Sequence, residues 1–506
     1  MNCIIGVDIG TTSTKAIAFD ISGNILSKSA IKYPIFSPTS TYSEQDPEEI
    51  FQAVLKTVRK TWEPIKESTT LLGISFSSAM HGIMPVDING TPLTHCIIWA
   101  DTRSKVVAQK IKRGPSGAYL YQRTGTPIHP MSPLCKIVWL KENMPQTFAA
   151  AYKFISIKEY VFLKFFNKYL IDYSVASSTG LFDIHDLIWN KQALIIAGIN
   201  ESKLSTPKSP YHQELNPQQK YVDLMGIPHH VPFIIGANDG CLANLGSNAI
   251  EKGRAAITIG TSGAIRIASP KPVHDQKSRI FNYILTKDYY IAGGPVNNGG
   301  IVLQWFLENI SRQKAETTLP GDISDYSYDL DSTVTIEAGS EGLIFLPYIL
   351  GERAPHWDAD ARGVFFGLNI KHTRAHMIKA ILEGIVYGVF SVAEALESTG
   401  EKIEVIYANG GFARSDEWVQ ILTDVFGKKV LVSESVEGSA WGAAIMGYYS
   451  LGKMGRLDDQ NCFQEKLREF IPNQRNHTIY NNTYKIYSRL YEKLKDEFLL
   501  LNTFQN

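Results

Sequence analysis

The chain has 506 residues, which is too long for one hydrophobic core and predicts two large domains or a duplicated pair. Hydrophobic residues at 44% and aromatic residues at 11% indicate a globular protein. Fifty Lys and Arg balance fifty Asp and Glu, which excludes a broad attraction for nucleic acid or anionic membranes and favours small molecules as partners.

The first predicted element is a β-hairpin over residues 4–20, IIGVDIGTTSTKAIAFD. Its turn is rich in groups that can donate to phosphate oxygens, and Asp8 can hold a hydrated Mg²⁺ beside them. The predicted phosphate-binding residues of this hairpin are Gly10, Thr11, Thr12 and Lys15. The alternative, an acid that only caps its own turn, is better for an isolated Gly-Thr-Thr sequence. The coincidence of acid, glycine, hydroxyls and lysine favours the phosphate site.

A second candidate follows the apolar strand predicted within residues 231–247, VPFIIGANDGCLANLGS. Asp239 lies at the carboxyl end of this strand, where the ligand sites of α/β sheets gather. A carboxylate there could accept the proton of an attacking hydroxyl, which is the task of a general base. Taken alone, Asn-Asp-Gly is more often a turn than a catalytic site.

Residues 254–268, RAAITIGTSGAIRIA, repeat the first hairpin about half the chain later. The second turn contains Gly260, Thr261 and Ser262. Two such hairpins facing each other would bind a nucleoside triphosphate from both sides. Two ordinary hairpins are the weaker alternative, because both turns use the same chemistry.

Paired hairpins of this kind resemble those of the actin, hexokinase and Hsp70 ATPase superfamily. Two further segments, residues 131–143 (MSPLCKIVWLKEN) and 362–388 (RGVFFGLNIKHTRAHMIKAILEGIVYG), resemble signatures of the FGGY carbohydrate kinases. The resemblance extends from residue 4 to about 450 and implies an α/β fold with two ribonuclease-H-like domains flanking a cleft. It implies ATP-dependent phosphorylation of a sugar or polyol, with Asp239 as general base and with Asp8 and Asp239 as ligands of Mg²⁺.

The resemblance also implies which residues contact the substrate. They are Met80, His81, Gly82, Asp101, Arg103 and Asp172. A Met-His pair is typical of the xylulokinase and gluconokinase branches, whereas glycerol kinases carry Arg-Glu there. In IIWADTRS, residues 97–104, Asp101 and Arg103 could bind hydroxyls, and Arg103 could bind a carboxylate through two hydrogen bonds. A surface ion pair between them is the alternative.

The nucleotide is expected to lie against glycine-rich backbone. A strand predicted within residues 406–427, IYANGGFARSDEWVQILTDVFG, ends at Asn409 and leaves bare backbone for an adenine ring. A plain strand-to-helix turn is the alternative, and the family resemblance favours the adenosine contact. With NNGGIVLQWF at residues 297–306, the predicted nucleotide-binding residues beyond the first hairpin are Gly260, Thr261, Ser262, Gln304, Gly410, Gly411 and Ala413.

We predict a first domain over residues 1–246, for sugar and phosphate, and a second over 247–506, for the nucleotide. The second domain should end in a packing helix, because NTYKIYSRLYEKLKDEFLLL has apolar residues at helical spacing. The small residues of 434–447 suit close helix packing within that domain. The polar segments 208–219 and 319–333 are predicted to be surface loops or insertions.

The five cysteines are widely spread, without CxxC spacing, so neither a disulfide framework nor a zinc site is expected. The N-terminus has no signal-peptide pattern, and no run of about 18 apolar residues is evident. We therefore expect a cytoplasmic protein that contacts neither membrane nor nucleic acid, and that assembles as a homodimer if it assembles at all.

Within the family, WADTRS, MHG, DYSVASSTGLFD and GERAPHWDADARGVFFGLN most resemble gluconokinases, since xylulokinases more often read W-N-D-G-R. The expected reaction is phosphorylation of D-gluconate to 6-phosphogluconate. D-xylulose or a rarer pentulose stays open as the substrate. An alternative of another class is an actin- or Hsp70-like ATPase that has no sugar substrate.

Overall fold

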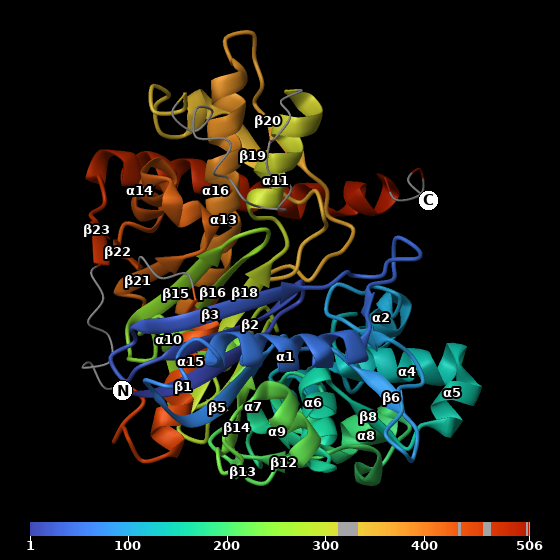
Figure 1. Ribbon diagram of the computed structural model, residues 1–506. Coiled ribbons are helices and arrows are strands. Elements are labelled where there is room, and N and C mark those ends of the chain that lie inside the picture. Colours follow the sequence, from blue (N-terminus) through green and yellow to red (C-terminus); the bar gives the residue numbers. More distant parts are fainter. Residues whose placement is uncertain (312–331, 434–436, 459–466, 502–503, 505–506) are drawn as a thin grey trace.

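The computed structural model describes residues 1–311, 332–433, 437–458, 467–501 and 504, which form two large β-sheets with helices on both faces (Figure 1). In spatial order the first sheet contains β13 (Gln213–Glu214), β14 (Phe233–Asn238), β5 (Thr70–Ser78), β1 (Asn2–Ile9), β2 (Ser13–Phe19) and β3 (Ile25–Lys32). The second contains β17 (Phe281–Thr286), β18 (Tyr289–Val296), β16 (Gly263–Ser269), β15 (Arg254–Ile259), β21 (Val405–Asn409), β22 (Lys429–Ser433) and β23 (Leu467–Phe470). The helices used below are α1 (Pro47–Trp62), α7 (Tyr173–Ser177), α10 (Asp239–Gly246), α11 (Gly300–Trp305), α13 (Arg374–Glu397), α14 (Asp416–Phe426), α15 (Gly438–Ser450) and α16 (Gln474–Leu501).

The two sheets repeat one strand topology. In the first, β1 pairs antiparallel with β2 and parallel with β5, and β5 pairs parallel with β14. In the second, β15 pairs antiparallel with β16 and parallel with β21, and β21 pairs parallel with β22. The predicted repeat of the hairpin is therefore confirmed, and it extends to the strands beside each hairpin.

The first strand shows why an apolar run becomes a central strand here. Successive side chains of a strand point to opposite faces of the sheet. Ile5 and Val7 are fully buried in the core that contains residues of α1, whereas Ile4 is buried in the core that contains residues of α15. Covering both faces requires the nearly continuous apolar sequence of β1, in which Asp8 is the exception.

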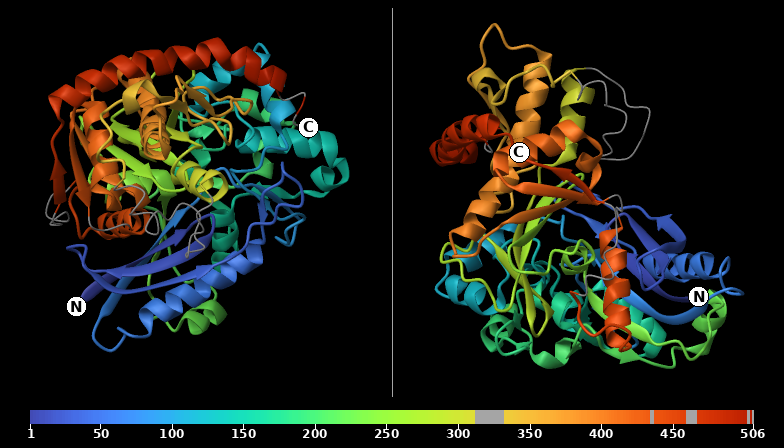
Figure 2. Two further views of the ribbon diagram at one scale, coloured as in Figure 1. Left: turned by 90° about the horizontal axis from the view of Figure 1, so that it is seen from above. Right: turned by 90° about the vertical axis from the view of Figure 1, so that its left-hand side faces the viewer.

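Helices α10 and α15 pack against each other through glycines. A Cβ added to Gly246 of α10 would lie 2.0 Å from the Gly438 oxygen of α15. A Cβ added to Gly442 of α15 would lie 2.0 Å from the Leu242 oxygen of α10. Helix α15 also packs on β1 and β5 of the first sheet, and the right-hand view of Figure 2 shows it, in orange, beside the blue N-terminal elements. The described part of the predicted packing segment, residues 437–447, therefore packs closely on another helix as expected, and it also contacts the first sheet, which was not predicted.

A third hydrophobic core lies within the long segment between β5 and β14 and is completed by Ile284 and Tyr290 from the second sheet. Within that segment, residues 208–219 were predicted to be a surface loop or insertion, yet they include β13, an edge strand of the first sheet. Most of the other predicted insertion, residues 319–331, lies outside the described residues. The domain boundary at residue 246 stays a prediction, although α10 does end there.

The C-terminal half carries two long helices. Helix α16 packs on α14 and β19 (Ile344–Leu346), which confirms the predicted packing helix. Helix α13 is long and apolar enough to span a membrane, contrary to the expectation that no such segment occurs. However, 78% of its most apolar window is buried inside the structure, as expected for a core helix.

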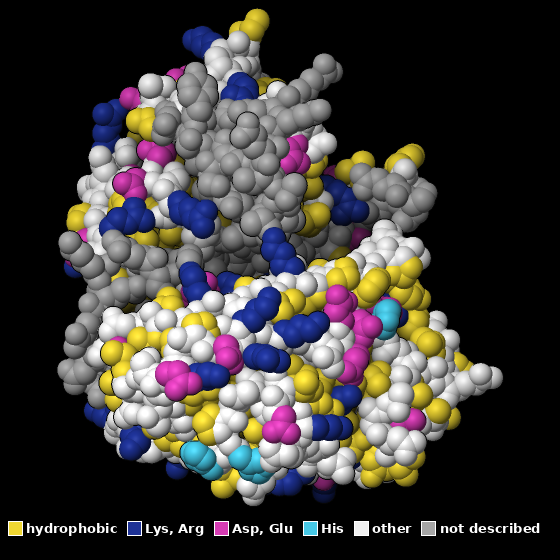
Figure 3. Space-filling view, in the orientation of Figure 1, with side chains coloured by type: hydrophobic (Ala, Val, Ile, Leu, Met, Phe, Trp, Pro, Cys, Tyr) yellow, Lys and Arg dark blue, Asp and Glu magenta, His cyan; other side chains and the backbone are white. Residues whose placement is uncertain are grey.

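The surface charges are mixed, as the balanced composition suggests, and the described cysteines are free. Figure 3 shows Lys and Arg interspersed with Asp and Glu on one face of the molecule. Cys3, Cys96, Cys135 and Cys241 are free and buried, and Cys462 lies outside the described residues.

Candidate active site

The turn of the first hairpin is held by aromatic side chains. The Tyr33 hydroxyl donates a hydrogen bond to the Gly10 carbonyl oxygen at 2.6 Å. The Tyr33 backbone N–H donates to the Thr12 carbonyl oxygen at 3.2 Å. The hydroxyl oxygen of Thr11 accepts one from Trp99 Nε1 at 2.9 Å. The turn is thus pre-organised by the protein, as a phosphate-binding loop requires.

Asp8 and Lys15 are partners across this hairpin. Ser77 donates a hydrogen bond to Asp8 Oδ1 at 2.7 Å, while burial raises the pKa of Asp8. Lys15 forms an ion pair of 2.8 Å with Glu437, the residue before α15. Lys15 would have to leave Glu437 to bind phosphate as predicted, so in this structure it links the hairpin to α15.

The second turn is braced by the segment around residue 299. Gly300 donates to the Gly260 oxygen at 2.7 Å and Gly299 donates to the Thr261 oxygen at 3.2 Å. Gly260 itself donates to the oxygen of Ser262 at 2.9 Å. A Cβ added to Gly299 would lie 2.7 Å from the Gly260 oxygen, whereas one added to Gly260 would meet no atom within 4 Å. The space beside Gly260 is therefore available for a ligand.

Gly260→Ala is expected to leave the melting temperature unchanged but to raise the KM for ATP about tenfold, equivalent to one charge-assisted hydrogen bond. The new methyl group meets no protein atom and so interferes only with bound phosphate. Gly299→Ala is the control and should instead lower the melting temperature, because its Cβ would meet the Gly260 oxygen at 2.7 Å. A normal KM for ATP in Gly260→Ala would contradict the phosphate assignment.

Asp239 begins α10 at the carboxyl end of β14, as predicted, and Asn238 caps this helix. Gly240 donates its backbone N–H to Asp239 Oδ1 at 2.7 Å. Burial and then the negative charge of Asp8 raise the pKa of Asp239 to about 6, while Arg266 acts in the opposite direction. The structure thus brings the two predicted metal ligands, Asp8 and Asp239, into electrostatic contact.

These two carboxylates fit a divalent cation. Oxygen ligands suit Mg²⁺, and burial raises the pKa of both groups in the metal-free protein. A cation would relieve the repulsion between them. Residues 1–311, 332–433, 437–458 and 467–501 contain no cluster of three or more His, Cys, Asp or Glu that could hold a metal without the ATP phosphates.

Arg266 is a site residue that the sequence interpretation missed. A Cβ added to Gly240 would lie 2.9 Å from Met80 Cε and 3.1 Å from Arg266 Nε, so both side chains meet beside Asp239. Met80 therefore lies beside Asp239, its predicted contact with substrate stays a prediction, and Arg266 reaches the same place from β16 of the second sheet. The available signal was one charged residue in the otherwise apolar run AIRIA.

His81 is buried with φ +67° and has both ring nitrogens engaged. The Ser178 carbonyl, 2.8 Å from Nδ1, can only accept, so Nδ1 carries the proton and Nε2 accepts from the Tyr283 hydroxyl at 3.2 Å. Burial, with smaller effects from Lys136 and Arg353, lowers the pKa of His81 to about 3. Both ring nitrogens thus have protein partners, and the predicted hydrogen bond from His81 to a substrate hydroxyl stays a prediction. Tyr283 is a second residue that was missed.

Gly82, the third member of this predicted substrate segment, is buried. A Cβ added to Gly82 would lie 3.1 Å from Cys96 Sγ. The packing against Cys96 explains the small residue without requiring a substrate contact.

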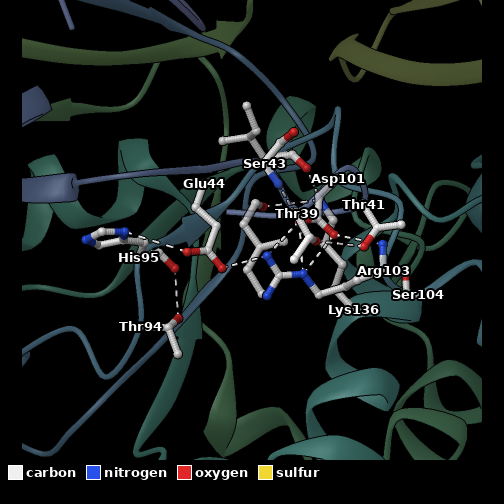
Figure 4. A network of polar contacts seen from close by, with 12 residues as sticks. Thr39, Thr41, Ser43, Glu44, Thr94, His95, Asp101, Arg103, Ser104 and Lys136 are labelled. Atoms are coloured by element: carbon white, nitrogen blue, oxygen red, sulfur yellow. Dashed lines mark hydrogen bonds and ion pairs between the residues drawn. The ribbon is translucent and has the colours of Figure 1, made fainter. Parts of the chain in front are cut away.

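Asp101 and Arg103 belong to a buried network (Figure 4). Arg103 donates to Asp101 through Nε (2.9 Å) and Nη2 (2.7 Å), and to Glu44 through Nη2 (2.6 Å). Its side chain is 4% exposed and its guanidinium lies 3.5 Å from the ring centroid of Tyr42. Two protein carboxylates already pair with Arg103, and its predicted contact with a substrate carboxylate stays a prediction. The alternative of a surface pair is wrong, since Asp101 is fully buried.

Asp172 is also structural. It accepts a hydrogen bond from the Val175 N–H at 2.9 Å, which caps α7, and its second oxygen lies 2.7 Å from Lys158 Nζ. Asp172 is fully buried. Asp172 thus holds α7, and its predicted role in substrate binding stays a prediction.

Arg353, in the GERAPHWD segment, is a third residue that was missed. It is buried and lies 4.8 Å from the ring centroid of Trp99. Its Nη2 donates to the Val296 oxygen at 3.2 Å, while burial lowers its pKa to about 10.

The predicted adenine-binding backbone follows β21. Gly410 has φ +103°, and a Cβ there would lie 2.5 Å from the Ile259 oxygen, so glycine is required by both conformation and packing. Gly411 and Ala413 lie in the 3₁₀ turn Gly411–Arg414 that follows, and their adenosine contacts stay predictions. Gln304, on α11, donates to Glu308 at 2.9 Å along the helix, and its predicted phosphate contact also stays untested.

The sequence was compared with protein families and with known proteins, and both comparisons point to carbohydrate kinases. Residues 3–246 match the N-terminal domain and residues 255–451 the C-terminal domain of the FGGY family of carbohydrate kinases. A gluconokinase of Bacillus subtilis (strain 168) is 44% identical over 505 residues, covering 99% of this chain and 98% of that protein. A xylulose kinase of Staphylococcus epidermidis is 29% identical over 503 residues, covering 97% of each.

The solved structures that resemble this chain are also carbohydrate kinases. The ligand-bound xylulose kinase from Lactobacillus acidophilus matches with a TM-score of 0.92 and 32% identity, covering 99% of this chain and 100% of that one. A gluconate kinase from the same organism matches with a TM-score of 0.91 and 33% identity, covering 97% and 98% respectively. These matches confirm the predicted two-domain α/β fold.

Proposed function

Because the chain belongs to the FGGY family of carbohydrate kinases, we propose that it transfers the terminal phosphoryl group of ATP to D-gluconate, forming 6-phosphogluconate. Gluconate is preferred as the substrate because the chain is 44% identical to a gluconokinase over nearly its whole length but only 29% identical to a xylulose kinase. D-xylulose is the second candidate, since a xylulose kinase is among the structures most similar in fold. An ATPase without a sugar substrate is set aside by the family membership.

In the proposed reaction, Asp239 orients the terminal hydroxyl of gluconate and accepts its proton as the oxygen attacks phosphorus. The turns at residues 10–12 and 260–262 bind the ATP phosphates through backbone N–H groups and hydroxyls. Asp8 and Asp239 would hold Mg²⁺, which when bound neutralises charge on the phosphates. The backbone at Gly410 and Gly411 supports the adenosine.

The first experiment is a panel of substrates. ADP formation by the full-length protein is measured with Mg·ATP and, in turn, D-gluconate, D-xylulose, glycerol and no acceptor. The highest kcat/KM is expected with D-gluconate. A preference for D-xylulose would overturn the gluconate assignment and leave the kinase assignment standing.

The value of kcat/KM for gluconate is expected to fall as the pH decreases below about 6. The pKa of Asp239 is raised to about 6 by burial and by Asp8, so below this pH the carboxyl is protonated and cannot accept a proton. The slope should approach tenfold per pH unit, and the fall should begin at a lower pH when Mg·ATP is saturating, because a cation beside Asp239 stabilises the charged carboxylate. A profile that stays flat from pH 7 to pH 4.5 would contradict the role of Asp239 as general base.

Two narrower properties belong to this proposal. A carbohydrate kinase whose one long apolar helix is mostly buried suits the cytoplasm, which we expect as its location. We also keep the expectation that the chain forms a homodimer if it assembles. Neither property affects the chemistry proposed for the site.

A further inference from the structure

Arg266 is a cation of the site that is attracted by Asp239 but forms no ion pair with it. Its Nε is buried and donates to no hydrogen-bond acceptor, and no ion pair of its guanidinium occurs within the described ranges. Burial lowers its pKa. A buried guanidinium N–H that makes no hydrogen bond is unfavourable, so this donor is prepared for an acceptor such as a carboxylate.

Its position identifies which part of a substrate this anion belongs to. Arg266 Nε lies beside Gly240 and near Met80, next to the carboxylate proposed as general base. The proposed phosphate groups are bound at the two hairpin turns, whereas Arg266 lies in β16, four residues beyond Ser262. Arg266 therefore faces the acceptor substrate.

The other buried arginines near the site are less suited to this role. Arg103 is paired with two protein carboxylates, Asp101 and Glu44. The Nε of Arg353 also has no hydrogen-bond partner, but its guanidinium lies over the Trp99 ring and its Nη2 donates to the Val296 oxygen. Asp239 interacts electrostatically with Arg266 but forms no ion pair with it, which leaves both groups available to a ligand.

We propose that Arg266 binds the carboxylate of the substrate and so selects a sugar acid over a neutral sugar or polyol. This inference rests on the proposed function and names the residue that determines its specificity. The acid would be held at one end by Arg266 and at the other by Asp239. Because Arg266 belongs to the second sheet and Met80 follows the first, the bound acid would also bridge the two halves of the molecule.

The test compares an acid with its neutral counterpart. Wild type and Arg266→Met are assayed with D-gluconate and with D-glucitol, which has the same carbon chain but no charge, at saturating Mg·ATP. The variant is expected to lose roughly 10- to 100-fold in kcat/KM for gluconate, as for a lost charge-assisted hydrogen bond. Its kcat/KM for glucitol and its KM for ATP should change little, and Arg266→Lys should recover part of the loss with gluconate.

Arg103→Met is the matched control, because it removes a buried arginine that is already paired. It should lower the melting temperature and affect both substrates alike. If glucitol is not turned over, calorimetric titration of gluconate into nucleotide-free wild type and Arg266→Met gives the same comparison, and unchanged affinity would overturn the inference.

The remaining outcomes separate the inference from the proposed function. A wild type inactive on gluconate would overturn the proposed function and the inference with it. A wild type active on gluconate, with equal losses for both substrates or a raised KM for ATP in Arg266→Met, would overturn the inference alone. The latter result would assign Arg266 to the transferred phosphoryl group.

Discussion

Asp239→Asn is expected to lower kcat by roughly 10²- to 10⁴-fold, as for loss of a positioned general base. Asparagine keeps the size of the side chain and can accept the hydrogen bond that Gly240 donates at 2.7 Å, but it cannot take a proton. The Kd for ATP should stay within a small factor of the wild-type value, because the base acts on the acceptor hydroxyl. Single-turnover kinetics and equilibrium titration of ATP measure the two quantities separately.

Asp20→Asn is a suitable control for this variant. Asp20 lies at the other end of the same hairpin, where its carboxylate accepts hydrogen bonds from Ser22 and Asn24 within a surface turn. This change should leave kcat unaltered. A near-normal kcat in Asp239→Asn would remove Asp239 from catalysis, and a loss well below a hundredfold would indicate that it only orients the substrate.

Gly442→Val is expected to lower both the melting temperature and kcat. A Cβ at this position would lie 2.0 Å from the Leu242 oxygen, so α15 must move away from α10, whose first residue is Asp239. Overpacking of this kind costs about 3 kcal/mol. For a domain of this size the melting temperature should fall by roughly 6 to 12 °C. Differential scanning calorimetry and a kcat measurement below the transition test both parts.

Gly455→Val provides the matched control, since a Cβ on Gly455 would meet no atom within 4 Å. This variant should unfold at the wild-type temperature and retain its kcat. If Gly442→Val behaved in the same way, the close contact between α10 and α15 would not determine the position of Asp239.

Features that depend on residues close together in the sequence could be predicted. The hairpins at residues 4–20 and 254–268 are specified by local apolar runs and turn residues, and Asp239 by the end of a strand. The amphipathic spacing in the last helix likewise predicted α16. Each of these patterns is periodic or short, so the chain's local preferences were sufficient.

Features that depend on contacts between residues far apart in the sequence could not be predicted. The family resemblance predicted a substrate contact for Arg103, and its pairing with Glu44, 59 residues away, could not be seen in the local motif. The same reason applies to His81, whose ring nitrogen accepts from Tyr283 across 202 residues. Arg266 is visible in the sequence only as one charge in a strand, and its contact with Gly240 required the assembled fold.

The central claim is that ATP is used to phosphorylate a sugar acid at the site of Asp239. The most direct measurement is ³¹P NMR of a reaction containing full-length protein, Mg·ATP and D-gluconate. The account predicts ADP together with an equal amount of a phosphomonoester on the terminal hydroxyl of gluconate, and both products formed roughly 10²- to 10⁴-fold more slowly with Asp239→Asn. Release of inorganic phosphate without a phosphomonoester, or an unphosphorylated gluconate after ATP is consumed, would contradict it.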